Sequence, residues 1–476
     1  MKITPIIGLE VHVELKTKSK MFCGCNADHF HVEANTHTCS TCLGLPGALP
    51  VPNKIACEWC VKLGLALGCT INEETFFERK NYFYPDLAKG YQITQLQKPF
   101  AINGKLSIEG HEIRINRAHM EEDTGKSVHI DGSTLLDFNR SGVPLVEIVS
   151  EPDIQSAEEA KKYLNKLQQI IRYIGISDAD IEKGSMRCEP TINVCIDGKF
   201  YTPLVEIKNV ASLTGVMNAI NYEIKRQIDQ YQSDKIEKSS TNKTTRGWDA
   251  DKNQTFLQRE KEGSADYRYF PEPDIPPIIF TPEQIEAIKK TIPELPEQKI
   301  IKYKALSLSD YDANLLADDS VFSSAFEKAL NATTDPEFAK FVANIFNGSL
   351  RTYLNEHKRE LDGSKINPLF FLNLFNSVNK QEVSSTVAKQ IIIMSYETGT
   401  DPVELAKTQG LLQVSDTSAL ENFAKEVIET NPKAVEDYRK NPLAIGFLVG
   451  QLMKISKGSA NPQTGKEILE KILKQI

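Results

Sequence analysis

The stretch at residues 117–127, RAHMEEDTGKS, places three consecutive acids before a Gly-Lys-Ser ending that is typical of phosphate-binding loops. A P-loop of the form G-x-x-x-x-G-K-[ST] needs a second glycine five places before Gly125, because its backbone must curl around the phosphates. That place holds Met120, and the adjacent acids would repel a phosphate unless a cation lay between them. The pattern therefore excludes a P-loop and favours a carboxylate cluster that holds Mg²⁺ for a nucleotide.

Two further stretches contain acids that could reach the same cation. Residues 8–15, GLEVHVEL, alternate apolar and polar side chains with a period of two, which predicts a strand with one polar face. Residues 143–149 are apolar except for one glutamate, and an acid in an apolar strand must be paired or coordinated to offset its desolvation cost. For residues 8–15 alone, a solvated face of an edge strand remains the alternative. Together the stretches predict that four side chains converge on one hard cation: Glu10, His12, Glu122 and Glu147.

Four of the nine cysteines form two short-spaced pairs, a C-x-C followed by a C-x-x-C. In a reducing compartment this spacing is typical of structural zinc, since four thiolates complete a tetrahedral ion and leave no open position. The alternative is that the thiols are reactive or merely buried. The predicted zinc ligands are Cys23, Cys25, Cys39 and Cys42. Three histidines of the intervening loop could replace a thiolate, although exposed loop histidines are the simpler interpretation: His29, His31 and His37.

The composition limits the class of protein. The chain has 476 residues, 40% of them hydrophobic and 25% charged, which is typical of a globular protein with two to four domains. No apolar run is long enough to span a membrane, and the first residues enter a strand-like pattern without a signal or transit sequence. We therefore expect a cytoplasmic protein with no membrane partner. A net charge of −8 argues against a sequence-independent binder of nucleic acid, DNA included, and permits an RNA enzyme with a local basic surface.

The periodicity of the sequence changes along the chain. Strand-like runs and glycine turns continue to about residue 292, interrupted by a polar stretch at 232–254 that predicts a hairpin or loop. Thr281 followed by Pro282 predicts a helix N-terminus, and helical periodicity follows. We predict an α+β fold in which a strand-rich cradle domain with the zinc site (1–292) precedes two all-helical domains (293–404 and 405–476).

Several long motifs span nearly the whole chain: IIGLEVHVEL, RKNYFYPDLAKGYQITQ, HMEEDTGKS, FNRSGVPLVEIVSEPD and GFLVGQLMKISKGSANPQ. Together they resemble the B subunit of the glutamine-dependent aspartyl/glutamyl-tRNA(Asn/Gln) amidotransferase, the GatB family. The resemblance implies a heterotrimer in which the two partners are the amidase (the A subunit) and the small C subunit. It also implies that the trimer converts misacylated Glu-tRNA(Gln), and often Asp-tRNA(Asn), to the amide.

The resemblance assigns the ATP-dependent step to this chain. A side-chain carboxylate is unreactive toward ammonia, so ATP first phosphorylates it and ammonia then displaces the phosphate. His12, Glu122 and Glu147 are implied to be Mg²⁺ ligands. Glu10 lies beside them, and Lys80 is implied to be the cation for the phosphoryl group or the substrate carboxylate, so both are assigned to catalysis. Two basic residues are expected to contact ATP, with ordinary surface ion pairs as the alternative: Arg187 and Lys208.

The helical tail is expected to bind tRNA. From Phe447 onward it holds five lysines and two glutamates, an excess that fits a small RNA-facing surface or simple solvation. No Ser-Ser-Lys amidase arrangement is found in the sequence, so a partner must supply the ammonia.

Four positions depart from the family pattern, and they leave the efficiency and the choice of charged tRNA open: Glu189, Thr191, Ala211 and Thr244. The alternative function is a zinc-stabilised tRNA-binding scaffold that has lost the ATP step. A pure scaffold would have no physical need for Glu147 in an apolar strand, so the sequence favours the enzyme.

Overall fold

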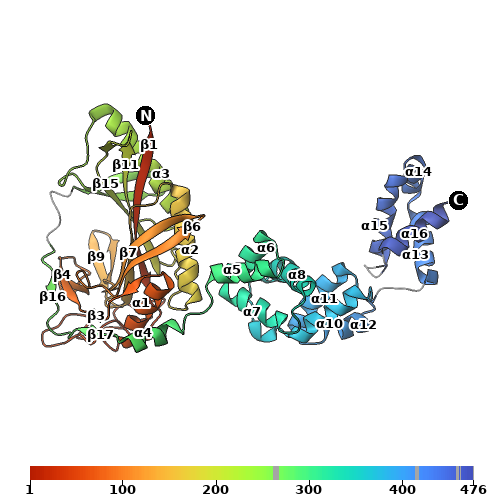
Figure 1. Ribbon diagram of the computed structural model, residues 1–476, viewed down its shortest axis with the longest axis horizontal. Coiled ribbons are helices and arrows are strands. Elements are labelled where there is room, and N and C mark those ends of the chain that lie inside the picture. The colour runs from red at the N-terminus through yellow and green to blue at the C-terminus, as the bar shows by residue number, and fades with distance from the viewer. Residues whose placement is uncertain (261–266, 413–416, 457–459, 461, 475–476) are drawn as a thin grey trace. The chain divides into compact units, whose positions relative to one another are not determined.

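The computed structural model describes residues 1–260, 267–412, 417–456, 460 and 462–474. The chain forms two compact units, which we name the N-terminal unit (Met1–Leu295) and the helical unit (Pro296–Ile476). The N-terminal unit contains the strands and the helical unit contains helices, which confirms the predicted α+β class (Figure 1). Lys457, one of the five lysines counted in the tail, lies outside the described residues.

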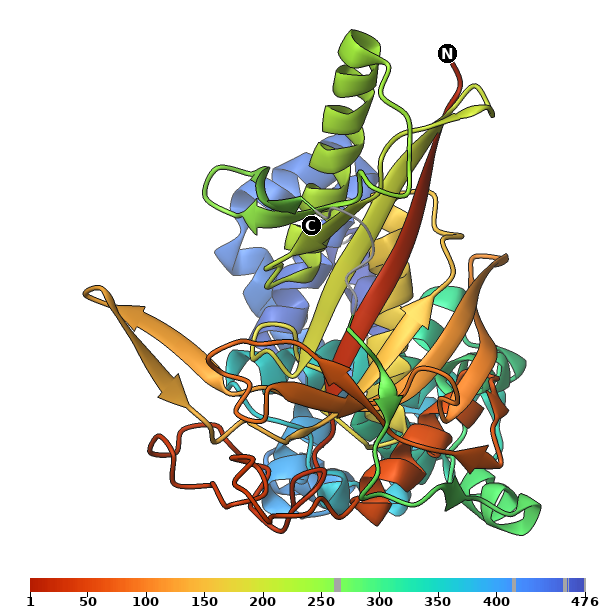
Figure 2. The ribbon, with the colours of Figure 1, turned by 90° about the vertical axis from the view of Figure 1, so that its left-hand side faces the viewer.

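A ten-stranded sheet forms the frame of the N-terminal unit, with the strand order β15-β14-β13-β11-β1-β10-β7-β6-β2 and β12 beside β11. The bounds are β1 (Ile3–Glu14), β2 (Thr70–Ile71), β6 (Ala101–Ile108), β7 (His111–Glu122), β10 (Pro144–Ser150), β11 (Met186–Ile196), β12 (Phe200–Tyr201), β13 (Val205–Lys208), β14 (Thr244–Asp249) and β15 (Gln254–Glu260). Its pairs are antiparallel except for β13 with β14. Figure 2 shows the long strands β1 and β11 running side by side.

Three smaller sheets lie around this frame. One has the order β16-β4-β5, with β16 at Phe270–Pro271, β4 at Glu78–Asn81 and β5 at Tyr91–Thr94. The second pairs β17 (Ile278–Ile279) with β3 (Glu74–Thr75), and the third is the hairpin of β8 (Lys126–Ile130) and β9 (Ser133–Asp137). The polar stretch at 232–254 begins with the last residues of a helix that ends at Asp234. A loop follows, and β14 then pairs with β15 as a hairpin, so the prediction of a hairpin or loop is confirmed from residue 235 onward.

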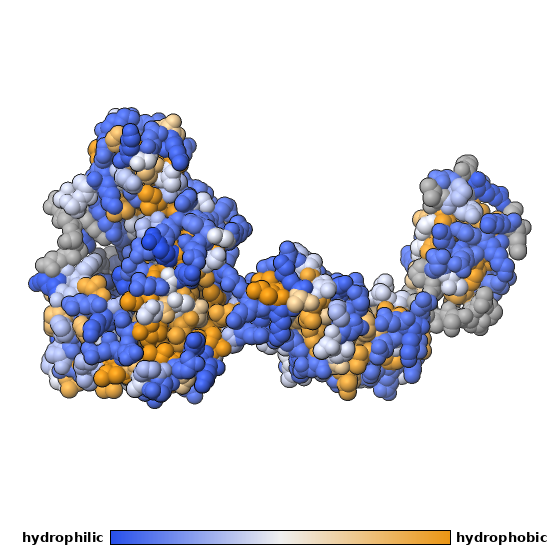
Figure 3. All heavy atoms as spheres, in the orientation of Figure 1, coloured by the Kyte–Doolittle hydropathy of each residue, from blue (hydrophilic) through white to orange (hydrophobic). Residues whose placement is uncertain are grey.

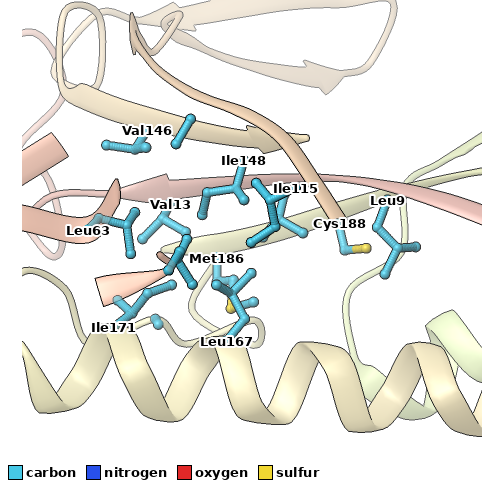
Figure 4. Packing of buried hydrophobic residues seen from close by; sticks show 14 of the residues in the cluster. Leu9, Val13, Leu63, Ile115, Val146, Ile148, Leu167, Ile171, Met186 and Cys188 are labelled. Atoms are coloured by element: carbon cyan, nitrogen blue, oxygen red, sulfur yellow. The ribbon is translucent and has the colours of Figure 1, made fainter. Parts of the chain in front are cut away.

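Alternation along the strands separates the two faces of the large sheet. Apolar side chains of β1, β10 and β11 point to α2 (Ala157–Tyr173), as Figure 4 shows for Val13, Ile148 and Met186 against Leu167 and Ile171. The side chain of Ser156 caps α2 by accepting from the Glu159 amide, and the apolar stripe of the helix is buried on the sheet. The charged side chains of the same strands alternate with these apolar ones and lie on the opposite face, where the site is found.

The described part of the N-terminal unit has three more helices: α1 (Lys54–Ala66), α3 (Leu213–Asp234) and α4 (Pro282–Lys289). Thr281 and Gln284 form a capping box at the start of α4, which confirms the predicted helix N-terminus. Figure 3 shows hydrophobic residues on the surface of this unit around α1. A groove lined by Cys57, Phe280 and Ile288 lies there between α1 and α4.

The helical unit contains two hydrophobic clusters, one from Tyr303 to Ala406 and one from Leu420 to Leu473. Its helices are α5 (Pro296–Ala305), α6 (Asp310–Ala317), α7 (Ser320–Leu330), α8 (Pro336–Asn344), η1 (Ile345–Leu350), α9 (Arg351–Glu356), η2 (Gly363–Lys365), α10 (Pro368–Asn379), α11 (Ser385–Thr398), α12 (Pro402–Thr408), α13 (Thr417–Thr430), α14 (Pro432–Lys440), η3 (Pro442–Ala444), α15 (Ile445–Ile455) and α16 (Pro462–Leu473). Ala406 is fully buried in the first cluster, and Leu411 and Leu412 pack against it, so a truncation that keeps this cluster intact must end after residue 412. Across the described ranges, every helix is too short or too polar to traverse a bilayer.

Candidate functional site

A pocket of about 370 Å³ lies on the polar face of the large sheet. It is lined by side chains from β1, β7, β10, β11 and β13, by β4, and by the segment that precedes β16. Six residues predicted from the sequence line it: Glu10, His12, Lys80, Glu147, Arg187 and Lys208. The strand-rich unit therefore brings together side chains that are up to about two hundred positions apart in the sequence.

The strand register explains why these side chains meet. His12 on β1 lies opposite Glu147 on β10 and opposite Arg187 on β11. Glu147 in turn lies opposite His119 on β7. Directly opposed residues project to the same face of a sheet, so the register forms a row of charged side chains across four strands.

His12, Glu121 and Glu147 form a group suited to a metal ion, because one ligand atom of each lies within 4.8 Å of the others. His12 Nδ1 is 3.6 Å from Glu121 Oε2 and 3.9 Å from Glu147 Oε2. This nitrogen is buried and has no hydrogen-bond partner among the described residues. A buried ring nitrogen that faces two carboxylates fits a bound cation, and mostly oxygen donors favour a hard one such as Mg²⁺ or Mn²⁺.

Electrostatic interactions link this group to Lys80. Burial and the negative charge of Glu121 raise the pKa of Glu147 to about 8. Burial would raise the pKa of Glu121 as well, but the charge of Lys80 lowers it well below its usual range. Lys80 Nζ lies 4.0 Å from Glu121 Oε1, and although burial opposes its charge, Glu121 raises the pKa of Lys80 above its usual range. Lys80 is therefore protonated at neutral pH beside an ionised Glu121.

The structure places Glu122 away from the side chains that the sequence prediction grouped with it. Its carboxylate accepts from Lys89 Nζ and, at 3.0 Å, from the Ile93 amide, and it is absent from the residues that line the pocket. The reason is the period of two along β7, which points His119 and Glu121 to one face and Glu122 to the other. Glu121 therefore occupies the place that was expected for Glu122.

Arg187 and Lys208 each form ion pairs within the pocket. Arg187 Nη2 lies 2.5 Å from Asp123 Oδ2. Lys208 Nζ lies 2.6 Å from Glu189 Oε2 and 3.2 Å from a Glu206 oxygen. Both bases therefore line the cavity as charged groups that acids hold in place.

The four departures from the family pattern have different surroundings. Glu189 lies opposite Glu10 in the register and reaches Lys208. Thr191 Oγ1 is buried without a hydrogen-bond partner in the described part of the chain. Ala211 is exposed in a loop, and Thr244 pairs with Val205 at the start of β14. Only Glu189 of the four lines the pocket.

The four predicted zinc ligands come together as a second group: Cys23, Cys25, Cys39 and Cys42. The Cys39 and Cys42 sulfurs are 3.9 Å apart, and the Cys39 amide donates to Cys42 Sγ at 3.1 Å. A hydrogen bond from the Cys23 thiol lowers the pKa of Cys42 to about 5, while burial raises the pKa of Cys25 to about 11. Four convergent sulfurs with a stabilised thiolate fit a tetrahedral zinc ion.

The loop between the cysteine pairs is tied to the rest of the unit by polar contacts. Lys20 is fully buried, and its Nζ donates to the carbonyls of His37 at 2.7 Å and Phe138 at 3.2 Å. His29 Nε2 lies 2.9 Å from Glu14 Oε2. The group of sulfurs therefore needs no loop histidine as a fourth ligand, and His29 and His37 have partners elsewhere.

Sequence reasoning missed Arg117, His119 and Glu121 as pocket residues. The signal was present in RAHMEE, where applying the same period of two as in GLEVHVEL would select 117, 119 and 121 together. The three consecutive acids concealed it, because composition alone does not say which of them shares the face of the histidine.

Comparison with known proteins shows similarity along the whole chain. Residues 5–286 match a family described as the GatB/GatE catalytic domain, and residues 324–473 match one described as the GatB domain. The B subunit of the aspartyl/glutamyl-tRNA(Asn/Gln) amidotransferase of Persephonella marina is 44% identical over 482 residues, which cover 100% of both chains. Proteins of the same name from Thermosipho melanesiensis and Caldicellulosiruptor saccharolyticus are 43% and 44% identical, over 99% and 100% of this chain and 100% of their own.

Proposed function

The chain belongs to the family of aspartyl/glutamyl-tRNA(Asn/Gln) amidotransferase B subunits, and from this premise we propose that it activates the side-chain carboxylate of a misacylated tRNA with ATP and forms the amide. The substrates are Glu-tRNA(Gln), Asp-tRNA(Asn) or both. The observation that carries the proposal is the convergence of His12, Glu121 and Glu147 beside Lys80 in one pocket. A tRNA-binding scaffold without chemistry would not need two buried acids around an imidazole nitrogen that has no hydrogen-bond partner in the described part of the chain.

The reaction requires two displacements. A carboxylate oxygen of the aminoacyl side chain attacks the γ-phosphorus of ATP, the bond to the β-phosphate oxygen breaks, and ADP leaves. Ammonia then attacks the acyl carbon, the bond to the phosphate oxygen breaks, and phosphate leaves as the nitrogen loses a proton. Negative charge crowds together in the first step, so fixed cations contribute most of the catalysis that a protein can supply.

The residues of the pocket have separate parts in this scheme. His12, Glu121 and Glu147 would hold a Mg²⁺ ion, which when bound neutralises phosphate oxygens. Lys80, held protonated by Glu121, orients the transferring phosphoryl group or the substrate carboxylate. Arg187 and Lys208 contact ATP from the β11 and β13 side of the cavity. Glu10 on β1 lies between these two basic residues and the group that would hold Mg²⁺. Asp123 fixes the position of Arg187, as Glu189 does for Lys208.

The rest of the proposal concerns assembly and the remaining parts of the chain. Zinc held by the four cysteines stabilises the loop at residues 23–42 and takes no part in the chemistry, because four thiolates leave no open position. The amidase partner supplies ammonia from glutamine and the small C subunit joins the two, in the cytoplasm. We keep the predicted domain limit at 292 as part of this proposal. We move the start of the tRNA-binding tail from 405 to after residue 412, because α12 packs in the first hydrophobic cluster of the helical unit.

Reconstitution tests the proposed function. The trimer of this chain with the amidase and the small C subunit, given glutamine and ATP, is expected to form amide on charged tRNA and to hydrolyse ATP only when that tRNA is present. The matched control omits this chain, and it should leave glutamine hydrolysis as the sole activity. Amide formation by the trimer without consumption of ATP would contradict the proposal.

A further inference from the structure

Four tyrosine rings form a continuous row from the pocket wall to the protein surface. Ring centroids are 6.1 Å apart between Tyr84 and Tyr82, 6.2 Å between Tyr82 and Tyr267, and 6.1 Å between Tyr267 and Tyr269. Tyr82, Tyr267 and Tyr269 line the pocket, and Tyr84 is 63% exposed. We name this row, Tyr84, Tyr82, Tyr267 and Tyr269, the tyrosine track.

The inner part of the track ends at the charged centre. Lys80 Nζ lies 5.9 Å from the Tyr82 ring centroid and 5.2 Å from that of Tyr267, and the same ammonium is 4.0 Å from Glu121. The negative face of an aromatic ring attracts a nearby cation, so the Tyr82 and Tyr267 rings help to hold the half-buried Lys80 ammonium in place. The track is therefore continuous with the site at which the proposed function places the substrate carboxylate.

Backbone contacts hold the two halves of the track together. Tyr82 and Tyr84 follow β4, and Tyr267 and Tyr269 precede β16, which pairs with β4. The Asn81 amide donates to the Tyr267 carbonyl at 2.9 Å, and the Asn81 side chain donates to the carbonyls of Tyr267 and Arg268 at 3.1 and 2.8 Å. The ring positions are thus set by a hydrogen-bonded frame.

The outer end of the track carries exposed apolar surface. Phe83 is 78% exposed, and it packs against Gly90, where a Cβ atom would lie 3.1 Å from the Phe83 ring. Gly90 has a φ of +70°, a conformation that glycine adopts readily. Because glycine has no side chain, the Phe83 ring can lie directly against the backbone at this position. Two neighbouring aromatic side chains held at the surface, both more than half exposed, are typical of a recognition site.

Flat aromatic rings beside cationic side chains are the elements that bind single-stranded nucleic acid, because every base offers a face for stacking. The row of four rings is longer than a single base, so the adenine of ATP alone would contact only part of the tyrosine track. The unpaired 3′ end of a tRNA, by contrast, must bring its aminoacyl group to Lys80 while its terminal bases remain farther out.

Resting on the function proposed above, we propose that Tyr84 and Phe83 stack the terminal unpaired bases of the tRNA, and that the tyrosine track directs the aminoacyl end to Lys80. Stacking of this kind contributes to the binding of tRNA, whereas phosphorylation and amide formation take place in the pocket. The loss of both rings is therefore expected to weaken binding of charged tRNA roughly tenfold or more, with unchanged use of ATP.

The test uses the reconstituted trimer carrying the double change Phe83→Ala and Tyr84→Ala. The expected result is a KM for charged tRNA raised roughly tenfold, with the KM for ATP, kcat at saturating tRNA and glutamine hydrolysis close to wild type. The conservative pair Phe83→Tyr and Tyr84→Phe should restore the wild-type KM, since it keeps the rings. The matched control is Tyr311→Ala in the helical unit, where a ring 74% exposed lies in another part of the chain.

A tRNA with 2-aminopurine as its terminal base gives a direct measure of stacking. Its fluorescence should be quenched by the wild-type and conservative trimers and remain high with the double alanine variant. An unchanged KM for tRNA with full quenching in that variant would overturn the proposal. A raised KM for ATP with an unchanged KM for tRNA would also overturn it, since the stacked base would then belong to ATP. If the wild-type trimer formed no amide, the proposed function would fail. Quenching of the labelled, uncharged tRNA by the wild-type trimer, compared with the double alanine variant, would still decide this inference.

Discussion

Glu121→Gln and Glu122→Gln change adjacent carboxylates on opposite faces of β7, and we predict opposite effects of the two substitutions. Glu121 belongs to the group that faces His12 Nδ1, whereas Glu122 accepts from Lys89 and the Ile93 amide outside the pocket. Glutamine is nearly isosteric with glutamate and carries no charge. Glu121→Gln should therefore abolish metal binding in a folded protein, and Glu122→Gln should destabilise a protein that still binds the metal.

The structure sets the expected magnitudes. With Glu121→Gln the site loses one of two carboxylates, and since changes outside the ligand set already cost about 10- to 100-fold in metal affinity, a loss of at least about 100-fold follows. The ion pair of Glu121 with Lys80, at 4.0 Å, is worth about 4 kcal/mol before desolvation at an effective dielectric constant of about 20. This value is an upper limit on the free energy of unfolding that Glu121→Gln loses. Glu122→Gln breaks a buried pair with Lys89 and should lower the free energy of unfolding by about 3 kcal/mol.

The assay measures Mn²⁺ binding by electron paramagnetic resonance and unfolding by urea on each purified variant. The reconstituted trimer is then assayed separately for glutamine hydrolysis, charged-tRNA-dependent ATP hydrolysis and amide formation. Glu121→Gln should retain only glutamine hydrolysis, and Glu147→Gln should behave in the same way. The reasoning is refuted if Glu122→Gln, and not Glu121→Gln, loses Mn²⁺ while both variants are folded.

Three other predictions concern regions outside the pocket. Protein purified without chelator should contain close to one zinc per chain, and the double change Cys39→Ser and Cys42→Ser should lower the melting temperature of the N-terminal unit. A metal analysis that finds no zinc in the wild-type protein would contradict this prediction. A chain ending after residue 412 should still bind ATP and lose affinity for tRNA, and the lost part should depend on salt; unchanged apparent affinity would exclude a tRNA-binding tail. Burial would raise the pKa of Glu327 but Lys299 at 2.7 Å lowers it, so the stabilisation is present above the unfolded-state pKa and is lost as the pH falls through the lower folded-state pKa. Glu327→Gln should accordingly cost at most about 1 kcal/mol at pH 7 and nothing below both pKa values, and a difference that persists in acid would count against the pair.

The sequence predicted those parts of the site that depend on local periodicity. The strands expected at residues 8–15 and 143–149 are present as parts of β1 and β10, except for the end residues 15 and 143. The antiparallel pairing of β1 and β10 places His12 opposite Glu147. The four cysteines converge as their spacing predicts, because two short-spaced pairs have few ways to close. In both cases the information lies within a short segment, where alternation or spacing alone determines geometry.

Other parts of the site depend on contacts that no local pattern contains. Glu189 and Lys208 meet only because β11 pairs with β13, and the register of that pair is set by the whole sheet. The choice between Glu121 and Glu122 depends on which face of β7 packs against α1. The contact of Tyr82 with Tyr267 requires β4 to pair with a strand nearly two hundred residues later.

Transfer of ¹⁸O tests the central claim most directly, because it follows the bond that the proposed chemistry makes and breaks. Glu-tRNA(Gln) or Asp-tRNA(Asn) labelled with ¹⁸O in the side-chain carboxylate is converted by the trimer, and the inorganic phosphate is analysed by mass spectrometry. If the carboxylate attacks ATP, one labelled oxygen should appear in phosphate for each amide formed, and Glu121→Gln should abolish this transfer. Unlabelled phosphate released alongside amide at the wild-type rate would contradict activation of the carboxylate by this chain.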